Sequence, residues 1–110
     1  MARTAVTATQ IDRSGDQVTG AAANVDGHSV TWRDTLFFYV NNGSGSAVTV
    51  TVDTPGTVDG LAITDLTLSV PAGEDRIFGP FPADYYRQSD GSVHVDFSAV
   101  TSVTFSAWYV

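Results

Sequence analysis

Residues 35–53 have the sequence TLFFYVNNGSGSAVTVTVD, and this stretch decides the fold class. Valine and threonine alternate from 48 to 52, which is the two-residue period of a strand with one apolar and one polar face. Residues 35–40 form the most apolar strand candidate, and the connection at 41–46 is polar and rich in glycine and serine. We therefore expect two strands joined as a β-hairpin by a loop of about five residues.

The same strand signals recur along the rest of the chain, whereas helix signals are nearly absent. Lysine does not occur, and glutamate, glutamine, leucine and methionine are scarce beside abundant valine and threonine. Segments bounded by Gly, Asn, Asp and Pro predict further strands at 4–11, 17–23, 66–70, 76–81, 92–97 and 103–109. One short helical turn is expected at 83–86.

These segments predict an all-β protein, a single antiparallel β-sandwich or jelly-roll-like domain of about seven to eight strands over residues 1–110. Residues 1–10 are expected either as an extended N-terminal arm or as an edge strand. Apolar residues that share a face along the predicted strands form the expected core: Val48, Val50, Val52, Leu66, Leu68, Val93, Val95, Phe97 and Phe105.

The strand at 35–40 is exceptional because both of its faces are apolar. Leu36, Phe38 and Val40 share one face, which leaves Phe37 and Tyr39 on the other. Such a strand either is central and covered on both sides or carries an interface. The alternative to an interface is that the loop at 80–86 folds over these side chains within one chain.

Aromatic residues provide the strongest functional lead. Tyr85 and Tyr86 lie in the longest irregular stretch, and Trp108 has outward parity in the last predicted strand. Tyr and Trp are enriched among the residues that dominate protein interfaces, and they also stack against sugars. The candidate interface residues are therefore Phe37, Tyr39, Tyr85, Tyr86 and Trp108.

The charge balance narrows the classes of partner. Twelve acidic residues against five basic residues give a formal net charge of −7, and all five basic residues are arginine. Nucleic-acid binding needs a basic footprint, and an anionic membrane surface attracts basic segments, so we expect neither partner. The absence of cysteine excludes disulfides, thiolate nucleophiles and cysteine zinc sites. The N-terminus lacks an unbroken apolar stretch, so we expect no signal sequence, and no stretch of about 18 apolar residues occurs that could span a bilayer.

The residues that could carry catalysis form no recognised signature. His94 and Asp96 share a strand face, with Ser89 and Ser92 nearby, but no Gly-x-Ser-x-Gly elbow occurs. This pattern is more typical of a polar row on a solvent-facing strand. His28 follows Asp-Gly and is expected in a loop, and no His-x-x-x-His spacing indicates a metal site.

Aspartates in loops raise the question of calcium. The pairs that could offer oxygen ligands are Asp12 with Asp16, Asp53 with Asp59, and Asp84 with Asp90. None has the dense Asp-x-Asp-x-Asp-Gly spacing of a calcium loop, and aspartate beside glycine is typical of turns. We expect no catalytic residue, no metal and no cofactor, and hence a protein that is not an enzyme.

Two phrases in the C-terminal half carry a family resemblance. Residues 70–82 are VPAGEDRIFGPFP, and residues 86–98 are YRQSDGSVHVDFS. Together with the surrounding strands at about positions 47–107, they resemble small virion proteins encoded near the head genes of tailed phages of actinobacteria. Several proteins of that kind are capsid decoration proteins, also called cement or minor capsid proteins. The family has no catalytic motif, so no functional residue is carried over.

The resemblance implies a β-sandwich on the outer capsid surface of a virion, made in the host cytoplasm. It implies the major capsid protein as partner and a homo-oligomer, most often a trimer. The alternatives are a carbohydrate-binding or adhesion module that uses the loop aromatics, and a tail-associated virion protein. A free-standing enzyme is the last choice.

Overall fold

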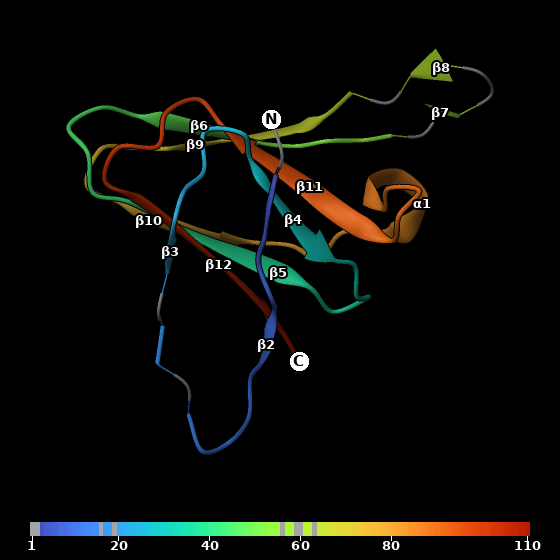
Figure 1. Ribbon diagram of the computed structural model, residues 1–110, viewed down its shortest axis with the longest axis horizontal. Helices are drawn as coiled ribbons and strands as arrows, with labels where there is room; N and C mark the ends of the chain where they lie inside the picture. The colour runs from blue at the N-terminus through green and yellow to red at the C-terminus, as the bar shows by residue number, and fades with distance from the viewer. Residues whose placement is uncertain (1–2, 16, 19, 56, 59–60, 63) are drawn as a thin grey trace.

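The computed structural model describes residues 3–15, 17–18, 20–55, 57–58, 61–62 and 64–110. They form two packed β-sheets, a two-stranded ribbon and one helical turn (Figure 1). The prediction of an all-β sandwich is confirmed, but the described parts of the two sheets hold ten strands, not seven to eight, and two of their pairings are parallel, so the sheets are mixed and not purely antiparallel. No helix in these ranges is long and apolar enough to cross a bilayer.

The first sheet has the strand order β1-β4-β11-β6-β9. Its strands are β1 (Thr4–Ala5), β4 (His28–Thr31), β11 (Ser92–Phe97), β6 (Val48–Val52) and β9 (Leu66–Val70). Three of the four pairings are antiparallel, and only β1 runs parallel to its neighbour β4. The Val-Thr alternation of β6 therefore lies in the interior of a sheet, between β11 and β9.

The second sheet has the order β10-β5-β12-β2, and β3 also pairs with β12. Its strands are β10 (Asp75–Phe78), β5 (Phe37–Asn42), β12 (Val103–Tyr109), β2 (Thr9–Gln10) and β3 (Ala21–Ala22). The ribbon consists of β7 (Thr57–Val58) and β8 (Leu61–Ala62), which lie away from the sandwich (Figure 1). The helical turn α1 (Ala83–Tyr86) lies where it was expected.

The hairpin predicted for residues 35–53 is wrong. Strands β5 and β6 belong to different sheets, so their connection crosses the sandwich instead of reversing within one sheet. Asn42, at the end of β5, is fully buried and organises this crossing. Its Nδ2 donates to the carbonyls of Ser46 (2.8 Å) and Val70 (3.0 Å), and its Oδ1 accepts from the Ser44 amide (3.0 Å). The asparagine thus ties the second sheet to the end of β9 in the first.

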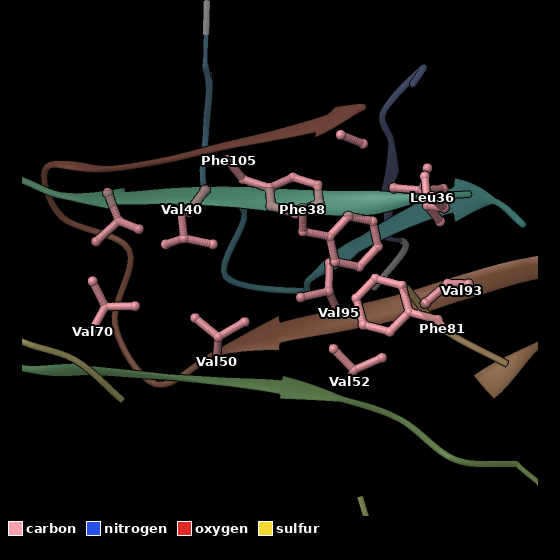
Figure 2. Close-up of a cluster of buried hydrophobic side chains, with 14 of the residues drawn as sticks. Leu36, Phe38, Val40, Val50, Val52, Val70, Phe81, Val93, Val95 and Phe105 are labelled. Atoms are coloured by element: carbon pink, nitrogen blue, oxygen red, sulfur yellow. The ribbon is translucent and has the colours of Figure 1, made fainter. Parts of the chain in front are cut away.

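The core lies between the two sheets (Figure 2). The first sheet contributes valines, and the second contributes larger side chains from one face of β5 and β12. Phe81, from the loop before α1, fills one end. Side chains at 0% or 1% exposure include Leu36, Phe38, Val40, Val48, Val50, Val52, Val70, Phe81, Val93, Val95 and Phe105.

Three of the predicted core residues are less buried than expected. Leu66 is 36% exposed, and Leu68 is half-buried, because β9 is an edge strand whose first part the second sheet does not cover. Phe97, at the end of β11, is also half-buried, although its ring packs edge-on against Phe105 at 5.8 Å. Alternation identified the inward face correctly, but it does not show how far along each strand the facing sheet extends.

His28 is a strand residue and not the loop residue expected from its Asp-Gly context. It begins β4, is 1% exposed, and stacks on Phe105 with ring centroids 5.1 Å apart. The Asn24 amide donates to Nε2, so Nδ1 carries the proton and donates to the Thr4 carbonyl at 3.1 Å. Burial lowers the pKa of His28, since the charged imidazolium is poorly solvated there.

The N-terminal segment contributes an edge strand to each sheet, first β1 and then β2. Thr4 lies opposite His28 in the first sheet, and Thr9 lies opposite Trp108 in the second. Backbone bonds continue both pairings, from the Val6 amide to Ser29 and from the Ile11 amide to Tyr109, each 2.9 Å. Within residues 1–10, Thr4–Ala5 and Thr9–Gln10 are therefore edge strands, joined by a non-strand segment at 6–8, and residues 1 and 2 lie outside the described ranges.

Candidate docking surface

The outer face of the second sheet carries a patch of apolar side chains. Phe37 and Tyr39 point outward from β5, Trp108 lies opposite Phe37 on β12, and Ile77 lies opposite Tyr39 on β10. Side chains from the segment between β2 and β3 complete a shallow hollow of about 140 Å³ above them. We call this surface the outer patch, made of Ile11, Val18, Phe37, Tyr39, Ile77 and Trp108.

The outer patch is only partly covered. Ile77 is 62% exposed, Val18 58% and Ile11 39%, while Phe37 and Tyr39 are half-buried. A larger groove of about 420 Å³ continues from Phe37 and Ile77 past Pro80 to the C-terminal Val110. Surface leucines or isoleucines that occur singly need no explanation, but a run of apolar residues beside a groove is typical of a contact surface.

Trp108 differs from the expectation of an exposed interface residue. It points outward, as its parity predicted, but it is only 6% exposed, and its Nε1 donates to Ser106 Oγ at 2.9 Å. The N-terminal segment covers it, because β2 pairs with β12 at Trp108 and brings Ile11 beside the ring. Trp108 is therefore the buried floor of the outer patch and is not a contact residue in the isolated chain.

The aromatic loop lies apart from the outer patch. Phe81 enters the core, and Trp32 Nε1 donates to its carbonyl at 2.7 Å. Tyr86 packs edge-on against Phe81 at 5.6 Å and is half-buried, whereas Tyr85 is 42% exposed. Neither tyrosine is among the described residues that line the patch or the groove. The loop thus closes one end of the sandwich and does not fold over the outer face, as the intrachain alternative required.

A charged cluster at the start of the chain was missed by the sequence analysis. Arg3 Nη1 donates to Asp96 Oδ1 at 2.6 Å and to the Val95 carbonyl at 3.2 Å, and Nη2 donates to Asp53 Oδ2 at 2.9 Å. The three charged side chains are half-buried. Arg3 thereby fixes the start of β1 onto the first sheet. Its partners are 50 and 93 positions away in the sequence, so no local pattern could indicate the cluster.

The two carboxylates of this cluster affect one another. Burial and the neighbouring Asp96 carboxylate raise the pKa of Asp53 to about 6, and the Arg3 guanidinium only partly offsets them. Gly27 lies against the same cluster, where a Cβ would collide with Asp96 Oδ1 and Arg3 Nη1 and would fall 2.7 Å from the Val95 carbonyl oxygen. Its φ of +84° also favours glycine. The cluster holds backbone and charge in place, and nothing in its geometry presents a nucleophile.

The Ser-His-Asp arrangement considered for β11 does not form among the described side chains. Asp96 is held by Arg3, while His94 Nε2 lies 3.9 Å from Asp90 Oδ2. Ser92 donates to Asp90 as well, through both its Oγ and its amide. Burial lowers the pKa of His94, and the charge of Arg3 lowers it further.

Of the loop aspartates weighed for calcium, Asp12 and Asp90 serve turns, whereas Asp53 pairs with Arg3. Asp12 accepts from Ser14 in the same way that Asp90 accepts from Ser92, which is typical turn chemistry. Asp16, Asp59 and the side chain of Asp84 lie outside the described parts. Among the residues that are described, no three His, Cys, Asp or Glu side chains are grouped to hold a metal ion.

Comparisons with known proteins identify no relative: no family model, no curated protein and no solved structure matches the chain.

Proposed function

We propose that the protein is a non-enzymatic structural protein of a phage virion that binds the outer capsid surface and stabilises the shell. The resemblance of residues 70–98 to capsid decoration proteins supports the setting, with the major capsid protein as partner. The observation that carries the proposal is the outer patch, an apolar surface in which Ile77, on the edge strand β10, is the most exposed side chain. No signal sequence is needed for a protein made in the host cytoplasm and assembled there.

The outer patch has enough apolar surface to anchor one copy on a shell. Fully burying an aliphatic or aromatic side chain stabilises a contact by about 1.5–3 kcal/mol, so two or three such residues suffice for specific docking. Ile77 and Val18 offer most of the surface that is still exposed, and half-buried Phe37 lines both the patch and the adjoining groove.

A sedimentation assay tests this function. The purified chain is mixed with capsids, lacking it, of the phage that encodes it, and bound protein is measured in the pellet. We expect saturable binding at a fixed copy number and greater resistance of the shells to heat. Absence of binding by the wild-type chain would contradict the capsid role.

Two variants locate the surface. Ile77→Asp places a charge on the most exposed side chain of the outer patch and should weaken shell binding at least tenfold without unfolding the chain. Val25→Asp is the matched control, since Val25 is 73% exposed in a turn away from the patch. Equal binding by both variants would show that the outer patch is not the docking surface.

A second candidate function rests on Tyr85. This ring is 42% exposed next to Tyr86, and Arg87 lies 5.8 Å from the ring centroid of Trp32, so the loop offers one open aromatic face for a sugar. A carbohydrate-binding module should bind in a glycan array and lose binding in Tyr85→Ala. In that case Ile77→Asp should leave glycan binding unchanged.

A further inference from the structure

The edges of the two sheets are protected unequally. Strands β1, β2 and β3 are two residues long, and β10 carries Asp75 and Arg76 before the chain reaches Gly79–Pro80. Short edge strands, charges and proline are the usual means by which proteins prevent edge-to-edge pairing. Strand β9 has none of them within its five residues, LTLSV, and Asp65 and Pro71 only flank it. Within the described ranges, no strand lies on the side of β9 opposite β6.

The apolar side of β9 is also incompletely covered. Val70 is fully buried at one end, but Leu68 is half-buried and Leu66 is 36% exposed at the other. Leu66 and Leu68 lie opposite the inward-pointing Val52 and Val50, so their side chains point to the core side of the first sheet. They form an apolar overhang beyond the second sheet. An added strand beside β9 would cover them.

We propose that β9 pairs antiparallel with β9 of a second copy, about a twofold axis at Leu68. In this register Leu68 lies opposite Leu68, Leu66 opposite Val70, and Thr67 opposite Ser69. The apolar residues then meet on the core side, and the hydroxyl residues, which are exposed in the single chain, meet on the outer side. The first sheets of two copies become one continuous sheet.

The sequence of β9 favours a second copy over another occupant because it is self-complementary. Its apolar positions are symmetric about Leu68, and no charge is placed opposite a like charge, since Asp65 falls opposite Pro71. An isologous contact of this kind closes at two copies and leaves neither β9 edge open. The surface lies on the first sheet, apart from the outer patch, and the inference does not depend on the proposed function.

Sedimentation equilibrium of the full chain over a range of protein concentrations tests the pairing. We expect a monomer–dimer equilibrium whose dimer has twice the 11.6 kDa mass of the chain. Each copy carries a net charge of −7, so added salt should strengthen the dimer by screening the repulsion. A wild-type chain that stays monomeric at millimolar concentration in high salt, or that forms the trimer implied by the family resemblance, would overturn the proposal.

Charge substitutions on the exposed side of β9 test the register. Thr67→Asp with Ser69→Asp places carboxylates opposite one another twice and should weaken the dimer at least tenfold. Thr67→Asp with Ser69→Lys places opposite charges across the axis and should restore it. The neighbouring positions on β6, Thr51 and Thr49, are uncharged, so both variants should fold.

A matched control separates the register from net charge. Thr31→Asp with Thr101→Asp adds the same two charges at exposed positions away from β9 and should leave the dimer nearly as stable as wild type. A dimer that survives the paired aspartates in β9, or that the Asp–Lys combination fails to restore while circular dichroism shows a folded chain, would overturn the proposed register.

Discussion

The two faces of the second sheet are built from neighbouring residues of the same strand, yet only one face is closed. Phe38 is fully buried, and its ring lies 4.6 Å from Phe81 and 5.0 Å from Phe105. Phe37, the preceding residue, is half-buried and lines the outer patch. The same residue type, phenylalanine, is thus a core residue on one face of β5 and a surface residue on the other. What decides burial is the element that covers each face, and the first sheet covers far more than the short N-terminal segment.

The largest effect is expected from truncating the inner ring. Phe38→Ala removes a side chain with aromatic neighbours on three sides and should lower the free energy of unfolding by about 3–5 kcal/mol. Phe37→Ala should cost about 1 kcal/mol, because its side chain is only partly removed from water. Urea denaturation measures both. Equal losses would mean that the outer face is as well packed as the core.

Trp108 tests the cover that the N-terminal segment provides. Trp108→Ala removes the floor of the outer patch and the hydrogen bond to Ser106, and it should destabilise the fold by about 3 kcal/mol. A loss below about 1 kcal/mol would show that β2 and Ile11 cover the ring only loosely.

The sequence predicted the parts of the fold that depend on local pattern. Alternation at 48–52 and 103–109 placed the inward residues correctly, and the two apolar faces of 35–40 indicated both the core and the outer patch. Prediction from the sequence failed where a segment's contacts come from residues far away in the chain. A Gly-rich connection of the same length can return within one sheet or cross to the other, and here the buried Asn42 bonds the crossing connection to the end of β9.

The candidate site was predicted in part for the same reason. Phe37 and Tyr39 do lie on a shared outer surface, whereas Tyr85 and Tyr86 belong to another region of the molecule. The burial of Trp108 depends on a segment about a hundred residues earlier in the chain, and although that segment was predicted as a strand, its local pattern does not show which strand it pairs with. Exposed Ile77 was overlooked because its strand is short and followed by Gly79–Pro80.

Two leucines extend the comparison to the sheet edge. Leu36→Ala should cost about 2–5 kcal/mol, because Leu36 is fully buried, whereas Leu66→Ala should cost about 0.5 kcal/mol in dilute monomer, because Leu66 is 36% exposed. Thermal unfolding at low protein concentration measures both. A large loss at Leu66 in the monomer would mean that the described edge of β9 is covered by another part of the chain.

The smallest effect concerns the charges that fasten the N-terminal segment. The pKa of Asp53 is raised from 3.8 to about 6 in the folded chain, so folding favours the protonated carboxyl. Its contribution to stability is therefore fully present below about pH 4 and is lost as the pH rises through 6. Asp53 is partly exposed, and solvent screening limits the contribution to about 1 kcal/mol, or a few degrees in Tm.

Asp53→Asn isolates this contribution. The pKa values of His28 and His94 are lowered on folding, so their contributions have the opposite sign and are lost as the pH falls below 6.5. The histidine contributions are present in both proteins, so they largely cancel when the Tm of the variant is subtracted from the Tm of wild type. We expect the Tm of wild type, relative to Asp53→Asn, to fall between pH 4 and pH 7, with most of the change below pH 6. A Tm difference that is constant with pH, or that rises, would mean that Asp53 is ionised beside Arg3 throughout this range. The Asp53 and Asp96 carboxylates would then exert no net repulsion on the strand edge that Arg3 holds.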